Sequence, residues 1–152
     1  MRSSVVRLPP LVHSTLDRHG FAHRLIAIAR NKRVSVYVGD GDNRRPAVHT
    51  LDAARVYRLA LESAPAGSRL HAVGDQGVRF RKIAEIIGRH LEVPVTSIRA
   101  EDAVDHFGFL GTFVTLDNPT SARLTRHMLS WQPTNPGPVD DLDRSGHYFQ
   151  AG

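Results

Sequence analysis

The chain has 152 residues, 41% of them hydrophobic, which is enough for one globular domain with a modest core. The absence of cysteine excludes disulfides and thiolate chemistry and favours a cytoplasmic protein, and no apolar run reaches the roughly 20 residues that a membrane-spanning helix requires. The formal net charge is +5, but no helix-turn-helix and no aromatic-and-basic strand pattern accompanies it, so a nucleic-acid partner is not favoured.

The first third of the chain predicts a strand, a helix and a second strand. The β-rich run Val5–Leu8 ends at Pro9, because proline cannot donate a hydrogen bond to a sheet ladder. Residues 21–30 carry apolar side chains at helical spacing, which predicts an amphipathic helix. A strand is expected over 35–38, and the glycine- and aspartate-rich residues 39–43 predict the turn that ends it.

The middle of the chain continues the alternation of helices and strands. After Pro46 we expect a brief extended segment and then a helix over 51–63 with Thr50 as its N-cap. A strand is expected over 69–73 and a loop over 74–77. Residues 79–91 form an amphipathic pattern, which predicts a further helix.

The last third predicts a short strand over 95–98 and a helix over 101–107. A fifth helix is expected over 118–129, since it would begin with an Asn N-cap and a Pro at the first helical position. Trp131 follows as a packing anchor, and Pro133 prevents the helix from continuing. Short strands alternating with helices indicate an α/β protein with one domain over residues 1–152, or a piece of a domain.

Three segments together carry a resemblance to a known family. Val6–His13 combines an Arg, two prolines, a Val and a His; Tyr37–Ala54 has a Gly-x-Gly turn, an Arg, a Val-His pair and an Asp opening an Ala-rich helix; Leu129–Pro133 contains a Trp before the Pro. In this order the segments are similar to the C-terminal half of extended short-chain dehydrogenase/reductases, the NAD-dependent epimerase/dehydratase-like family. Ser14 and Ser130 stand where that family usually has Gly. An aromatic commonly follows the loop Arg there, whereas this chain has Arg45.

The resemblance implies a partial Rossmann-type fold, consisting of the last sheet strand or strands and a small C-terminal substrate-binding lobe. It implies that the loop with Pro10, Leu11, Val12 and His13 lies beside the nicotinamide of NAD or NADP in a full-length parent enzyme. The substrate would be a small carbonyl or sugar-like molecule. We expect it to contact a second group of residues, namely Arg44, Arg45 and His49.

The chain lacks the two features that this chemistry needs. A dinucleotide is held by a Gly-rich turn between a strand and a helix, and no such fingerprint occurs here. The family's acid catalyst is a Tyr with a Lys four residues later, whereas Tyr37, Tyr57 and Tyr148 are followed at that spacing by Gly, Leu and Gly. We therefore expect no catalytic residue in this chain, and no tight cofactor binding or hydride transfer by the chain alone.

These observations predict the C-terminal part of a longer enzyme, which would expose a strand edge and associate with a Rossmann-half partner or with itself. Two alternatives remain open: a stand-alone, non-catalytic ligand-binding or interaction module, and a subunit of a split reductase. A metal site is not expected. The pair His19 and His23 has the spacing of zinc ligands on a helix, but it lacks the Glu between them, and no Cys supports it.

Overall fold

The computed structural model describes residues 3–144 and 146–150 of the chain. Its strands are β1 (Val5–Arg7), β2 (Leu11–His13), β3 (Ser35–Val38), β4 (Arg44–His49), β5 (Arg69–His71), β6 (Asp75–Arg79) and β7 (Val95–Ile98). Its α-helices are α1 (Phe21–Lys32), α2 (Thr50–Ser63), α3 (Phe80–Leu91), α4 (Ala103–Phe107), α5 (Gly111–Val114), α6 (Arg123–Leu129) and α7 (Pro138–Arg144). Three short 3-10 turns complete it: η1 (Ala100–Asp102), η2 (Gly108–Leu110) and η3 (His147–Phe149).

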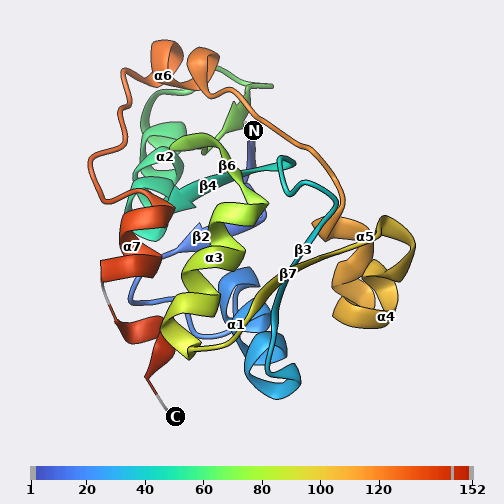
Figure 1. Cartoon of the computed structure of the whole chain (residues 1–152). Helices are drawn as coiled ribbons and strands as arrows, with labels where there is room; N and C mark the ends of the chain where they lie inside the picture. Colours follow the sequence, from blue (N-terminus) through green and yellow to red (C-terminus); the bar gives the residue numbers. More distant parts are fainter. Residues whose placement is uncertain (1–2, 145, 151–152) are drawn as a thin grey trace.

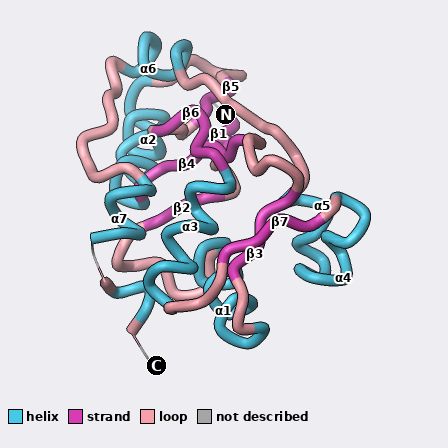
Figure 2. Tube along the Cα trace, viewed as in Figure 1, coloured by secondary structure: helices cyan, strands magenta, loops and turns pink. Residues whose placement is uncertain are grey.

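The strands form three small sheets (Figure 2). In the central one, β4 lies between β2, which runs parallel to it, and β6, which runs antiparallel. The β4–β6 register shifts between Arg45 and Ala47, at Pro46, which has no N–H to donate. The other two sheets are the parallel pairs β1–β5 and β3–β7. No other strand pairs with β1 in the part of the chain that the structure describes.

The helices surround the central sheet (Figure 1). Helix α7 contacts all three of its strands, while α1 packs on β2, α2 on β4 and α3 on β6. Helices α4 and α5 form a separate bulge beside β3 and β7, seen at the right of the view. Within the described ranges, no helix has the length and apolar character needed to cross a membrane.

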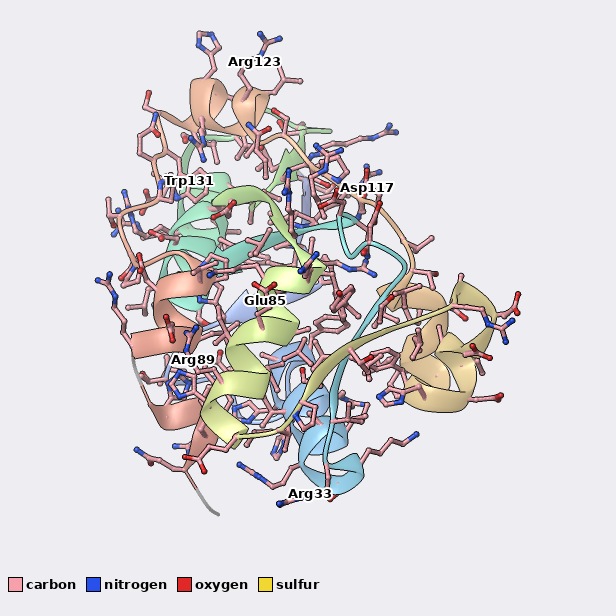
Figure 3. The ribbon with its side chains drawn as sticks, viewed as in Figure 1. Arg33, Glu85, Arg89, Asp117, Arg123 and Trp131 are labelled. Carbon is pink, nitrogen blue, oxygen red and sulfur yellow. The ribbon has the colours of Figure 1, made fainter. Side chains whose placement is uncertain are left out.

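Buried apolar side chains form two clusters. The Phe80 cluster joins α1, β3, α3, α4 and α7, and its largest members include Phe80, Ile83 and Leu142. The Trp131 cluster joins α2, β5 and the segment after α6 around Trp131, which is fully buried beside α2 and α6 (Figure 3). The expectation that Trp131 is a packing anchor is confirmed, and so is the α/β class.

Most predicted elements are present, with three corrections. Of residues 74–77, which were expected to form a loop, 75–77 are the first part of β6, which pairs with β4. The helix expected over 118–129 begins at Arg123, because the backbone N–H groups of Asn118 and Thr120 donate to carbonyls of β4 and β6 instead of starting a helix. Helix α2 begins one residue earlier than expected, and its N-cap is His49, whose Nδ1 accepts the Leu51 N–H.

Candidate functional site

The pairing of β2 with β4 brings together the two groups of residues that the sequence singled out. Leu11 lies opposite Ala47, and His13 lies opposite His49, so the loop predicted to lie beside the nicotinamide and the strand predicted to contact the substrate are neighbours in one sheet. The rings of His13 and His49 meet edge to face with centroids 5.5 Å apart. Pro10 and Pro46, at the other end of the pair, line one pocket.

That pocket, which we call the Pro10 pocket, has a volume of about 300 Å³. It lies where β1 ends at Arg7 and β5 ends at His71, and both of these residues line it. The parallel strands β1 and β5 therefore direct their carboxyl ends toward it, which is where open α/β sheets bind ligands. The remaining lining residues are Leu8, Pro9, Pro10, Pro46, Val73, Asn118 and Thr120.

The polar lining of the Pro10 pocket is basic or neutral. Arg7 and His71 supply nitrogen donors, and Asn118 and Thr120 supply an amide and a hydroxyl. No carboxylate is among the described residues that line it. This set suits an anionic or hydroxyl-rich small molecule, although the volume is at the small end of the range for ligand pockets.

The other members of the nicotinamide loop are turned inward. Leu11 and His13 are fully buried, and Val12 is half-buried against the Trp131 cluster. His13 Nδ1 lies 2.8 Å from Asp141 Oδ2, while its Nε2 is buried without a described partner. Burial lowers the pKa of His13, although the hydrogen bond in which the Asp141 carboxylate accepts from His13 opposes that shift. In this structure His13 therefore ties β2 to α7.

The two arginines at the start of β4 have opposite environments. Arg44 is exposed, and its Nη2 lies 3.0 Å from Asp117 Oδ2 (Figure 3 labels Asp117). This carboxylate raises the pKa of Arg44. Arg45 is 2% exposed, its Nε and Nη2 lack hydrogen-bond partners among the described residues, and its guanidinium lies 5.9 Å from the centre of the Phe21 ring. Burial lowers the pKa of Arg45. Burying a guanidinium without hydrogen-bond partners costs folding free energy, and the rest of the fold offsets that cost.

His49 lines a second, smaller pocket of about 100 Å³, together with His13, Asp52, Asp75 and a turn before α7. Asp52 is 1% exposed. Burial alone would raise its pKa, but the backbone N–H groups of Thr134 and Asn135 hydrogen-bond to the carboxylate and lower the pKa. Asp52 therefore fastens the chain after Trp131 to α2, which is a structural role.

Four polar residues of the Pro10 pocket were not among the site residues predicted from the sequence. Arg7 could have been found, because it lies in the strand predicted over 5–8, which leads into the loop with Pro9 and Pro10. His71, Asn118 and Thr120 gave no such signal, since 118–120 were expected to start a helix. Among the described residues, no cluster of three or more histidines and carboxylates could hold a metal ion.

In the described part of the chain, the Gly39–Gly41 turn does not form the strand–turn–helix that holds a dinucleotide. The Gly39–Gly41 turn leads from β3 into strand β4, not into a helix, so no helix N-terminus faces a pyrophosphate there. A Cβ at Gly41 would lie 2.5 Å from Arg81 Cβ, so this glycine serves close packing and a positive φ. The residues present do not fit the group by themselves.

Two curated relatives match this chain over nearly its whole length. No family model matches the chain. An uncharacterized protein of Schizosaccharomyces pombe is 48% identical over 149 residues, which are 98% of this chain and 50% of that protein. An uncharacterized protein of Saccharomyces cerevisiae is 47% identical over 138 residues, 91% of this chain and 46% of its own length. The chain thus spans about half the length of the curated relatives it matches.

Solved structures show what the fold is similar to. Pal from Bacillus thuringiensis superposes with a TM-score of 0.68 at 17% identity, covering 97% of this chain and 45% of that one. The dTDP-glucose 4,6-dehydratase DesIV of Streptomyces venezuelae, with NAD and TYD bound, gives 0.68 at 19%, covering 96% and 43%. An ADP-L-glycero-D-manno-heptose-6-epimerase of Helicobacter pylori gives 0.66 at 14%, covering 95% and 43%. The fold is short-chain-dehydrogenase-like. It corresponds to somewhat less than half of each of these longer chains.

Proposed function

We propose that this chain is the C-terminal, substrate-binding portion of an NAD(P)-dependent oxidoreductase or epimerase of the short-chain dehydrogenase type, and that it does not transfer hydride by itself. The observation that carries the proposal is the position of the Pro10 pocket at the carboxyl ends of β1 and β5. Pro10 of the predicted nicotinamide loop lines this pocket, and within the described chain β1 has an open edge at which a further parallel strand could pair.

The ligand class follows from the lining. DesIV and the heptose epimerase are named for nucleotide-linked sugars. Arg7 and His71 suit the phosphate of such a molecule, and Asn118 and Thr120 suit its hydroxyls. Arg45 is a second candidate contact, because an anion would supply the hydrogen-bond partners that its buried guanidinium lacks, provided that Phe21 moves aside. The departures at Ser14 and Arg45 argue against taking the exact sugar from the neighbours.

The binding half of the proposal is tested on the purified 152-residue chain by isothermal titration with UDP-glucose, as a probe of the ligand class, and with NADP. We expect measurable binding of UDP-glucose, weakened about tenfold in Arg7→Ala, since one charge-assisted hydrogen bond contributes about 1.5–3 kcal/mol. Arg123→Ala is the matched control, because Arg123 lies on α6, outside the pocket. Tight NADP binding to the chain alone that persists after Arg18 and Arg30, which lie outside the Pro10 pocket, are replaced by Ala would contradict the proposal.

The claim that the chain does not transfer hydride by itself is tested by mixing it with a second polypeptide. The part of the Schizosaccharomyces pombe relative that the comparison does not cover is expressed separately and added to this chain. We expect NADPH oxidation with a panel of small carbonyl compounds only when both polypeptides are present. Turnover by this chain unaided would overturn the idea that it lacks the hydride machinery.

A further inference from the structure

A second concavity lies far from the Pro10 pocket, between the exposed flank of α1 and the end of the described chain. Both lie at the lower end of the view in Figure 1, and α1 contacts η3 directly. The groove has a volume of about 820 Å³. Its lining residues are Arg18, His19, His23, Arg24, Ile26, Ala27, Arg30, His147, Tyr148 and Gln150.

The groove differs from the rest of the surface in its charge. Arg18, Arg24 and Arg30 are exposed, and none of them forms an ion pair with a described carboxylate. Elsewhere many exposed arginines do, as in the Arg44–Asp117 and Arg81–Glu85 pairs. No described residue that lines the groove is acidic. Arg24 donates one N–H to the His19 carbonyl and lies over the Phe109 ring, and Arg30 donates one N–H to the Phe149 carbonyl. Each guanidinium has five N–H donors, so the three arginines keep further donors for a ligand on this surface.

The neighbouring carboxylate does not neutralise these arginines. Asp17 accepts the Gly20 N–H at 2.7 Å and the Tyr148 hydroxyl at 3.3 Å, so its oxygens face the loop and the floor of the groove. The first turn of α1 contains no acidic residue, so the positive end of the helix dipole adds to the potential at Arg18 and His19.

The floor of the groove is aromatic and fixed in place. Tyr148 is 2% exposed, its hydroxyl also accepts the Ser14 N–H, and its ring packs 4.8 Å from the His23 ring and 3.9 Å from the His147 ring. A rigid floor keeps the surrounding cationic side chains at a constant spacing, which reduces the entropy cost of binding.

We infer that this groove binds a small molecule that carries a diphosphate. Guanidinium groups bind phosphate oxygens bidentately, and two or more phosphates can engage arginines from both the loop before α1 and the outer face of the helix. The volume suits a nucleotide-sized ligand and is far larger than one inorganic ion requires. The groove lies outside the Pro10 pocket, so this inference does not depend on the proposed function.

The test is isothermal titration of the full chain with inorganic pyrophosphate at constant ionic strength. We expect saturable 1:1 binding, weakened about tenfold in Arg18→Ala and in Arg30→Ala, and less in Arg18→Lys, which keeps the charge but not the bidentate geometry. Arg123→Ala should leave pyrophosphate binding unchanged, because Arg123 lines neither pocket. Melting curves check that each variant is folded.

Three results would overturn the inference. The first is no saturable binding, or binding that Arg18→Ala and Arg30→Ala leave intact. The second is a loss of pyrophosphate binding in Arg7→Ala, which would move the ligand to the Pro10 pocket and support the proposed function alone. The third is tighter binding of a single-stranded oligonucleotide with a steep salt dependence, which would make the groove a polynucleotide surface.

Discussion

The Phe80 and Trp131 clusters are both well packed, but they differ in what covers them. The Phe80 cluster has helices or strands on several sides, with α1, α3, α4 and α7 around β3. The Trp131 cluster is smaller, and it lies next to the open strand pair β1–β5, where Val5 and Tyr57 are about half exposed and Leu61 is 79% exposed. A shallow pocket lined by Val6, Tyr57 and Leu61 lies on the same side. Exposed apolar side chains thus lie along an open strand pair beside the Trp131 cluster, whereas those near the Phe80 cluster, Val104, Phe109 and Phe113, lie on the short helical segments α4, η2 and α5.

The largest effect is expected on the free energy of unfolding, in two variants that each disrupt one of the clusters. Trp131→Ala and Phe80→Ala each remove a fully buried aromatic side chain, and each is expected to cost about 3–5 kcal/mol of unfolding free energy. Hydrogen exchange should then differ. Trp131→Ala should accelerate exchange in β1, β5 and α2 while α3 stays protected, whereas Phe80→Ala should expose both regions.

If both variants lose protection uniformly, the two clusters form one cooperative unit, and the contrast between them is wrong. A Trp131→Ala melting curve unchanged from wild type would also discard the view that this side chain anchors the region. Urea denaturation followed by circular dichroism supplies the free energies for both variants.

A smaller effect is expected at the link between the central sheet and α7. Because burial lowers the pKa of His13, the unfolded chain takes up a proton more readily than the folded one. The free energy of unfolding should therefore fall as the pH drops below about 6.5, the usual histidine value, toward the lowered pKa. His13→Asn keeps a donor for Asp141 but does not titrate, so its stability should fall less over that window.

Denaturation at a series of pH values measures this difference. The exposed His127 on α6 supplies the matched control, His127→Asn, which should keep the wild-type pH dependence. An identical pH profile for His13→Asn and wild type would show that the buried pair makes no pH-dependent contribution.

The smallest effect is expected at Arg44. Its ion pair with Asp117 is exposed on both sides, so Arg44→Ala should leave the melting temperature within experimental error. Asp117→Ala should be more harmful, because Asp117 Oδ1 also accepts the Arg44 backbone N–H at 2.7 Å. Equal melting temperatures for the two variants would mean that this backbone contact adds nothing.

Local signals in the sequence predicted most helices and strands, because apolar periodicity, prolines and glycines act within a few residues. They failed where distant segments decide the outcome. Residues 118–122 have the composition of a helix start, yet their backbone hydrogen bonds go to β4 and β6. Residues 74–77 have the composition of a loop, yet β4 pairs with them.

The candidate site was predictable only in outline. The sequence placed Pro10 in the loop that lines the pocket, but it did not show that Leu11 and His13 face the core. It did not distinguish Arg44 from Arg45, because burial depends on which face of β4 meets α1 and Phe21. His71 and Thr120 reach the pocket only through tertiary contacts that no spacing reveals.

The segment between α5 and α6 connects β4 with β6, and Ala122 at its end packs in the Trp131 cluster. Its backbone is fixed at two points, from Asn118 to the Arg44 carbonyl and from Thr120 to the Gln76 carbonyl, and the side chains of both residues form one wall of the Pro10 pocket. The length and the side chains of this segment can change while the packing of the interior stays the same. Divergence of ligand preference among related proteins would then concentrate in these few residues, and they are the natural place to begin redesigning what the pocket accepts.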